Sequence, residues 1–350
     1  MRYSGVEVTA VMGEGRLVTG LDVGTTKVCV AIGERTNLDV ELLGHAVVPT
    51  RGLKHGMVVN HERAAEAVRE ALGLAELRAG RSVTRAYLSL CEMNTRPEPA
   101  SQVARKRGPG RMQSLIRCVE STGVQIEDLV LAPLASAEVL VTEHDKALGV
   151  AVVDIGGATT DVAVFARGEV ACTQVLPVGG LHLTSDLAQG LRTPLREAER
   201  VKRQHGCVFM PVLDASPETN EELLIASVGD RPPHVCTQEQ LATIVEARCA
   251  EIVMGVEQVL LHAGCALGAG IVLCGGTSQL PGLAELTQQL LGVPVRRLHA
   301  VGVRGPRNVL DDPAHTAAIG LLLHTHRHAQ TEHTSVARRD SAVVLQQPGV

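Results

Sequence analysis

Apolar residues occur along the chain in short runs separated by turns rich in aspartate, glycine and threonine. The first run, 17–21, ends at Asp22, and a second run, 28–32, begins directly after Lys27. Two apolar runs joined by such a turn predict a β-hairpin. A further strand is expected over 40–48.

Helical spacing of apolar residues predicts a helix over 62–79, and the next apolar run predicts a strand over 85–90. Residues 96–111 combine prolines, glycines and a run of basic side chains, which indicates a loop that contributes little to a core. Helical spacing returns over 113–122.

The pattern of strand, turn and strand then begins again at residues 150–154. Asp154 lies 132 residues after Asp22, a spacing typical of a duplicated domain, so two similar lobes are expected. The remaining patterns predict strands over 162–165, 169–176 and 270–274, helices over 194–204, 238–262, 281–291 and 314–324, and a polar, proline-bearing segment over 211–236.

Length and composition favour two lobes of α/β architecture. A chain of 350 residues exceeds the usual span of one hydrophobic core. It is 45% hydrophobic but only 1% aromatic, so its cores are expected to consist of Val, Leu, Ile and Ala, as in buried parallel strands covered by helices. The net charge of -5 and the scarcity of aromatic side chains argue against nucleic acid as a partner.

The nine cysteines form no C-x-x-C pair, which favours a reduced, cytoplasmic compartment. No stretch reaches 18 apolar residues, so no membrane span is expected, and the N-terminus lacks the features of a signal peptide. His324, His326 and His328 alternate, but without a framework of Cys or carboxylate ligands a solvated tail explains them better than a metal site.

Two turns of the Asp-Gly-Thr type, each after an apolar strand, can hold a triphosphate from both sides of a cleft. Glycine allows backbone N–H groups to approach phosphate, threonine adds hydroxyl donors, and aspartate can hold Mg²⁺ through its water shell. Each turn alone is a weak signal, since ordinary hairpins have similar compositions. The candidate residues are Asp22, Gly24, Thr25, Thr26 and Lys27 in the first turn, and Asp154, Gly156, Gly157, Thr159, Thr160 and Asp161 in the second.

A third turn, Gly275-Gly276-Thr277, follows an apolar strand and precedes a predicted helix, so an adenosine could lie against its backbone. A simple strand-to-helix connection explains it equally well. Glu199 and Lys202, three residues apart on a predicted helix, could reach a ribose, although an intrahelical ion pair is the commoner reason for this spacing. The P-loop and dinucleotide-binding fingerprints are both absent from the sequence.

In order along the chain, the three turns and their strands resemble the phosphate-1, phosphate-2 and adenosine motifs of actin-like ATPases. Further stretches narrow the resemblance to the FtsA family of bacterial cell-division proteins. These stretches are 128–136, Val178-Gly179-Gly180 with Thr184-Ser185-Asp186, 191–194 followed by 197–202, and 228–233. The resemblance runs from about residue 17 to 324 and implies an actin-like, duplicated ribonuclease-H-like α/β fold with two lobes and a nucleotide cleft.

The resemblance also implies that ATP and Mg²⁺ bind between the lobes, with Gly179 and Gly180 joining the nucleotide-binding residues. Asp22 and Asp154 are then the candidate metal-binding and catalytic residues. It implies a role in linking the FtsZ ring to the cytoplasmic face of the inner membrane at the division site, together with other division proteins and self-association. In the family, the subdomain corresponding to 195–264 binds the FtsZ C-terminal tail.

The resemblance divides the chain into several expected parts. Lobe I comprises 1–90 and 113–149, lobe II comprises 150–194 and 265–325, residues 91–112 are the remnant of an inserted subdomain, and 326–350 are a disordered tail. Residues 335–350 contain no aromatic side chain, so direct membrane attachment through an amphipathic helix is not expected.

Two further departures from the family concern the cleft. Ala158 stands where the family usually has glycine, which would cause strain if this position required positive φ. Ala132 replaces the Glu or Gln that orients water in related ATPases, so hydrolysis is expected to be slow at best, with water polarised by Asp154 or held by 132–136. The alternatives are a sugar-type kinase of the same fold, an Hsp70-like chaperone, and a degenerate, non-hydrolysing scaffold.

Overall fold

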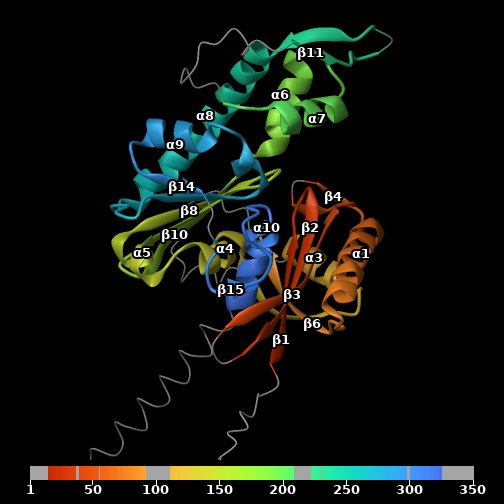
Figure 1. The fold of residues 1–350 in the computed structure, drawn as a ribbon, viewed down its shortest axis with the longest axis vertical. Helices are drawn as coiled ribbons and strands as arrows, with labels where there is room; N and C mark the ends of the chain where they lie inside the picture. The colour runs from red at the N-terminus through yellow and green to blue at the C-terminus, as the bar shows by residue number, and fades with distance from the viewer. Residues whose placement is uncertain are drawn as a thin grey trace, which may run out of the picture.

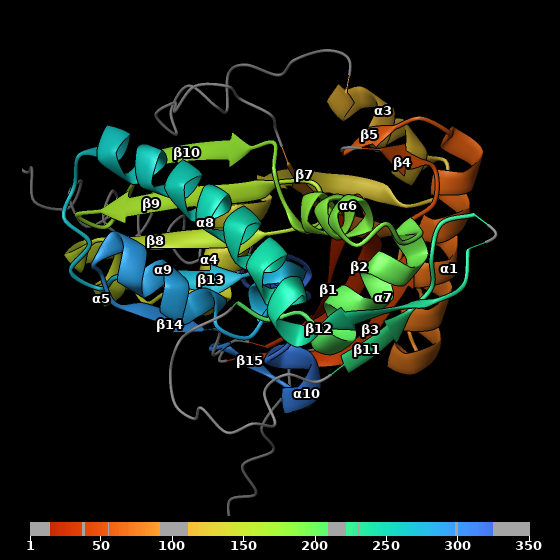
Figure 2. The same cartoon turned by 90° about the horizontal axis from the view of Figure 1, so that it is seen from above.

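The computed structural model describes residues 15–36, 39–54, 56–91, 111–208, 222–229, 231–297 and 300–324. It contains two larger β-sheets, which lie beside each other in Figure 1 and Figure 2. The expected inserted-subdomain remnant, the disordered tail, part of the polar segment 211–236, and His326 with His328 lie largely or wholly outside the described residues.

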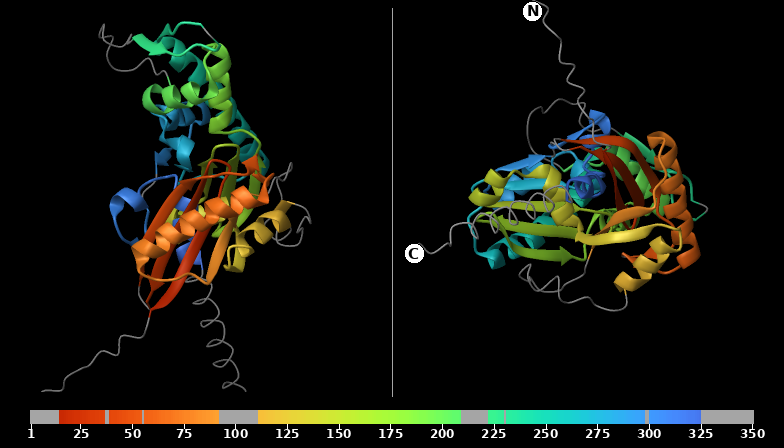
Figure 3. Two further views of the ribbon diagram at one scale, coloured as in Figure 1. Left: turned by 90° about the vertical axis from the view of Figure 1, so that its right-hand side faces the viewer. Right: turned by 90° about the horizontal axis from the view of Figure 1, so that it is seen from below.

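The first sheet has the strand order β15-β3-β2-β1-β6-β7, with helix α1 on its outer side (Figure 3). Its strands are β1 (Arg16–Val23), β2 (Lys27–Arg35), β3 (Val40–Pro49), β6 (Arg85–Leu90), β7 (Gln125–Leu131) and β15 (Val303–Arg304). The elements β4 (Leu53–Lys54), β5 (Met57–Val58), α1 (His61–Ala79) and α3 (Arg111–Glu120) also belong to this lobe. The chain continues through α4 (Ala132–Leu140) and α5 (Glu143–Leu148), which both contact the second sheet.

The second sheet has the strand order β10-β9-β8-β13-β14. Its elements are β8 (Val150–Ile155), β9 (Thr160–Ala166), β10 (Glu169–Leu176), β13 (Ile271–Cys274), β14 (Val295–Arg297), the 3₁₀ helix η2 (Gly276–Gln279) and α9 (Leu283–Leu291). The part above this sheet in Figure 1 contains α6 (Gly180–Gly190), α7 (Leu195–His205), β11 (Glu222–Ile225), β12 (His234–Thr237) and α8 (Gln238–Ala263). The last elements are α10 (Arg307–Leu310) and a helix over 316–324.

The two sheets confirm the predicted duplication. In each, three antiparallel strands are followed by two parallel ones, so β3-β2-β1-β6-β7 corresponds to β10-β9-β8-β13-β14. The sequence period that predicted two lobes is therefore a repeated strand topology, with β15 added at one edge.

Three cores built from Val, Leu, Ile, Ala and Cys hold these layers together. One lies between the first sheet and helices α1 and α3, and another between the second sheet and helices α6 to α9. The middle core is shared, because apolar side chains of both sheets pack around α4 and the helix 316–324. With only one phenylalanine in them, these cores confirm that aliphatic side chains do most of the packing.

Most predicted elements are confirmed to within a few residues, but two details differ. Pro194 was expected to start a helix and instead occupies the N-cap of α7. Strand β11 lies in the polar segment 211–236 and β12 begins in it; each is only four residues long, and neither was predicted from the sequence. Strands this short carry little periodicity, so pairing with a partner strand decides their conformation.

Candidate functional site

The two Asp-Gly-Thr turns have the same local structure. Gly24 N–H donates to the Lys27 carbonyl at 2.9 Å, and Gly156 N–H donates to the Thr159 carbonyl at 2.9 Å. Each bond closes a four-residue turn between two antiparallel strands, and in each the aspartate lies two residues before the glycine. The local sequence is sufficient to form both turns, since they need only a hairpin register and a glycine.

The fold brings these two turns together across the lobes. A Cβ atom built on Gly157 would overlap the side chain of Thr26, with its Oγ1 at 3.1 Å, so Thr26 of lobe I fills the space that a side chain at 157 would need. Beside this contact, Ser89 donates to Asp22 Oδ1 at 2.5 Å. The predicted arrangement of two phosphate-type turns facing one another is therefore present in the geometry.

The third turn and helix α6 are both attached to the second turn. Thr277 Oγ1 donates to the Gly156 carbonyl at 2.9 Å, and the Gly180 N–H donates to the same carbonyl at 3.0 Å. Gly179 lies close enough that a Cβ on it would be 2.7 Å from the Gly156 carbonyl oxygen. The N-terminus of α6 thus points its backbone at the turn, an arrangement suited to anions.

Gly275 and Gly276 have different environments. Gly275 has φ +81°, and a Cβ there would lie 2.5 Å from the Ile155 carbonyl oxygen, so only glycine fits. Gly276 is exposed, and a Cβ on it would meet only the Ala314 Cβ at 3.8 Å. An adenosine against this open side stays a prediction from the sequence.

Glu199 and Lys202 form the expected intrahelical ion pair, with 2.6 Å between Oε2 and Nζ. Lys202 also donates to the Gly180 carbonyl at 2.9 Å and to Thr184 Oγ1 at 2.8 Å. The pair therefore lies against the first turn of α6, beside Thr277. The ion pair is confirmed, and a contact with a ribose stays a prediction.

Thr160 and Thr25, like Thr277, use their hydroxyls within the protein. Thr160 is fully buried and donates to the Val178 carbonyl at 2.8 Å, so it supports the second turn from behind. Thr25 Oγ1 accepts from the Gly56 N–H at 2.9 Å. Ala158 does not have positive φ, so its methyl group does not strain the turn.

Three aspartates gather beneath the turns. Burial, together with repulsion from Asp22, raises the pKa of Asp154 to about 6, although Lys27 opposes the shift. Burial and repulsion from Asp154 raise the pKa of Asp161 to about 7. Ser136 belongs to the segment 132–136, which was expected to hold the water that attacks ATP. Its hydroxyl donates to Asp154 Oδ2 at 3.2 Å.

Asp161 is a further functional candidate. The sequence includes it in the second Asp-Gly-Thr turn but predicts no role for it. It pairs directly opposite Asp154 between β8 and β9. The hairpin register expected from the sequence could therefore have placed Asp161 beside Asp154. Its Oδ2 accepts from Thr159 Oγ1 at 2.9 Å, while its buried Oδ1 has no hydrogen-bond partner among the described residues.

The carboxylates of Asp22 and Asp154 fit a divalent cation. Asp22 lies close enough to raise the pKa of Asp154 by charge repulsion, Lys27 opposes this shift, and a divalent cation would relieve the repulsion further. Within the described ranges, no three His, Cys, Asp or Glu side chains converge as a complete protein-only site. An open site completed by water and phosphate oxygens is the arrangement that Mg²⁺ favours.

The raised pKa values predict that metal-free protein loses stability as pH rises. Because native Asp161 and Asp154 bind a proton more tightly than the unfolded chain, their contribution is full below about pH 4 and is lost through pH 6 to 7. Between pH 5.5 and 8 we expect a loss of about one to a few kcal/mol, at roughly 1.4 kcal/mol per pKa unit. Urea denaturation in chelator should show it, with a smaller loss in Asp161→Asn. Equal stability at both pH values would contradict the prediction.

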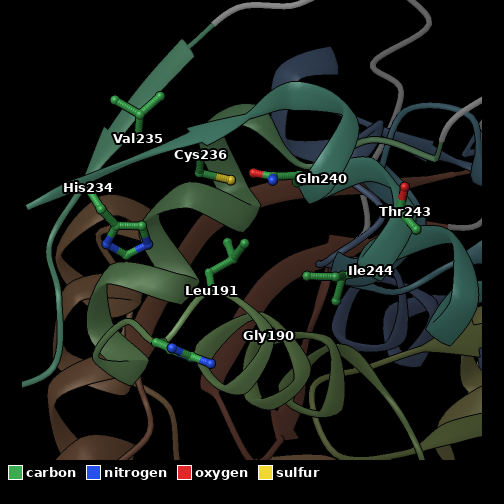
Figure 4. Close-up of a pocket in the computed structure, with 9 residues that line it drawn as sticks. Gly190, Leu191, His234, Val235, Cys236, Gln240, Thr243 and Ile244 are labelled. Atoms are coloured by element: carbon green, nitrogen blue, oxygen red, sulfur yellow. The ribbon is translucent and has the colours of Figure 1, made fainter.

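A second candidate site is a pocket of about 490 Å³ between the end of α6, strand β12 and helix α8. Leu191, Cys236 and Ile244 point into the space between these elements, with Gln240 and Thr243 beside them (Figure 4). The lining also includes His234 and Arg192, so the pocket combines an apolar centre with polar and basic groups. This composition suits a short peptide with apolar and acidic side chains.

Among the described helices none is long and apolar enough to cross a membrane.

Comparisons with known proteins agree with this geometry. The family model described as "Cell division protein FtsA" matches residues 151–320. The chain is similar to the cell division protein FtsA of Pseudomonas aeruginosa, at 31% identity over 89% of each chain. It is also similar to FtsA of Bacillus subtilis, at 30% identity over 92% of this chain and 86% of that one. MreB5 of Spiroplasma citri bound to ADP has a TM-score of 0.64 at 15% identity, covering 91% of this chain and 98% of MreB5, which confirms the actin-like fold.

Proposed function

Because this chain belongs to the FtsA family of cell-division proteins, we propose that it binds Mg²⁺ and ATP between its lobes and links the FtsZ ring to other division proteins. Nucleotide binding is supported mainly by one observation: Thr26 packs against Gly157, so the two phosphate-type turns face each other across the lobes. The ADP bound to MreB5, a protein of the same fold, supports it.

In this proposal, different residues contact the phosphates, the ribose and the adenosine of ATP. The N–H groups of Gly24 and Gly156 close the turns themselves, so the phosphates would be held by the other backbone N–H groups of the turns together with Thr26 and Lys27. Glu199 and Lys202 would reach the ribose. The turn at Gly276 faces the adenosine. Asp22 and Asp154 would hold Mg²⁺, which would supply charge neutralisation for the phosphates.

Hydrolysis is expected to be slow at most. The segment at the start of α4 offers Ser136, whose hydroxyl already donates to Asp154, and Ala132, which has no polar group. Nucleotide occupancy that alters the contact between the lobes is therefore the better description of what ATP does here.

The direct test is calorimetric titration of the full chain with Mg²⁺ and ATP. Binding in the micromolar to millimolar range would support the proposal, with Asp154→Ala expected to weaken it. A wild-type chain that shows no heat of binding at millimolar ATP would refute the nucleotide part.

We further propose that the part spanning 195–264, together with the end of α6, binds the FtsZ C-terminal tail in the pocket between α6, β12 and α8. The apolar side chains Leu191 and Ile244 would take up apolar residues of the tail, and Arg192 would attract its acidic ones. The proposal also includes two properties that the family resemblance implies. These are a location at the inner membrane of the division site and self-association.

Thr243→Trp is expected to block the pocket and weaken binding of an FtsZ tail peptide by roughly tenfold or more, at least about 1.4 kcal/mol. Met254→Trp is the matched control, since it is also an exposed position on α8 but does not line the pocket. Fluorescence anisotropy with a labelled peptide measures both. If the two variants bind alike, the tail docks elsewhere.

A further inference from the structure

Cys91 lies at the junction between the lobes. It directly follows β6 of the first sheet, yet its Sγ is 3.4 Å from Thr159 Oγ1 and 3.6 Å from Asp161 Oδ2, both in the second lobe. Of the nine cysteines it is the one that is exposed. A thiol and a carboxylate from opposite lobes are therefore in direct contact at this junction.

Asp161 supplies an independent indication that a ligand belongs here. The residue is only 5% exposed, and its Oδ1 has no hydrogen-bond partner within the described part of the chain. A buried carboxylate oxygen left without a partner is costly, and a nearby cation relieves that cost. Asp154 adds a second negative charge beside it.

The spacing of the two groups matches a metal with a soft ligand. Zinc binds cysteine sulfur at about 2.3 Å and carboxylate oxygen at about 2.1 Å, so a tetrahedral angle places the two ligand atoms about 3.6 Å apart. The observed separation of Cys91 Sγ and Asp161 Oδ2 is 3.6 Å. A cation can thus replace the thiol proton with little movement of either group.

We propose that Cys91 and Asp161 bind a thiophilic divalent cation of the zinc class, which bridges the two lobes. The sulfur–metal bond forms as the thiol proton leaves to solvent, and water completes the coordination. This site is separate from the Mg²⁺ expected at Asp22 and Asp154, because Mg²⁺ prefers oxygen ligands. It requires no nucleotide, so it stands independently of the proposed ATP binding.

Cobalt(II) is the probe, titrated into the nucleotide-free full chain with a non-thiol reductant. We expect a thiolate-to-cobalt charge-transfer band in the near ultraviolet. It should be absent in Cys91→Ser and require roughly tenfold or more cobalt in Asp161→Asn, since even indirect partners of a metal typically contribute this much. Cys265→Ser and Cys207→Ser are matched controls that should retain the band.

The sulfur band separates this site from the histidines near the C-terminus, which give no such transition. Circular dichroism establishes that each variant is folded, and Cys91→Ser is conservative at an exposed position. No band in the wild type, or a band that survives in Cys91→Ser, would overturn the proposal. If Asp161→Asn needs no more cobalt than the wild type to produce the band, the proposal is also overturned, because the carboxylate is then not a ligand.

Discussion

Replacing Gly320 with alanine is expected to destabilise the protein by about 3 kcal/mol or more. Gly320 lies in the buried helix 316–324, where a Cβ would overlap the Ala135 carbonyl oxygen and lie 2.6 Å from its carbonyl carbon. The helix cannot shift away freely, because a Cβ on Gly20 would overlap the Ala318 carbonyl on its other side. The substitution therefore separates α4 from this helix and opens the shared core.

Gly73→Ala is the matched control for this effect. Gly73 lies within α1, is exposed, and has nothing within 4 Å of a Cβ built on it. Alanine there should stabilise the chain by about 0.5–1 kcal/mol through helix propensity. Urea denaturation of both variants measures the difference, and similar midpoints for the two would show that the helix 316–324 is not tightly held.

Gly276→Val is expected to weaken ATP binding by roughly a hundredfold or more, about 2.7 kcal/mol, with little change in stability. The backbone at 276 has no positive φ, and a Cβ meets only Ala314 at 3.8 Å, so the fold accepts a side chain. The two valine methyl groups instead occupy the side proposed for the adenosine. Calorimetry measures binding and thermal unfolding measures stability.

Two glycine variants sharpen the interpretation. Gly73→Val places the same side chain at an exposed position of α1, outside the three turns, and should bind ATP as the wild type does. Gly275→Val should instead unfold the protein, because φ is +81° there and the Cβ would lie against Ile155. If Gly276→Val binds ATP normally, the adenosine does not contact this turn.

The match to the FtsA family favours the cell-division interpretation over the sugar-type kinase and the chaperone. The sequence indicates this family through motifs, each of which is a contiguous stretch of a few residues. Such stretches are informative because a tight turn imposes local requirements: glycine where backbone approaches phosphate, and threonine and aspartate at its edges.

The sequence by itself determined the repeated strand-turn-strand pattern, the residues of the three turns, and most helices and strands. These follow from hydrophobic periodicity and backbone sterics, which act over a few neighbouring residues. The 132-residue spacing between Asp22 and Asp154 was sufficient to predict two lobes, since each lobe repeats the same local rules.

Only the tertiary structure decided which residues from different lobes touch. The packing of Thr26 against Gly157, the contact of Cys91 with Asp161, and the burial that raises the Asp161 pKa depend on how the two sheets pack around the helix 316–324. The pocket beside α8 likewise depends on the short hairpin β11–β12. Contacts between residues far apart in the chain are set by shape and volume across a shared core, which no local pattern records.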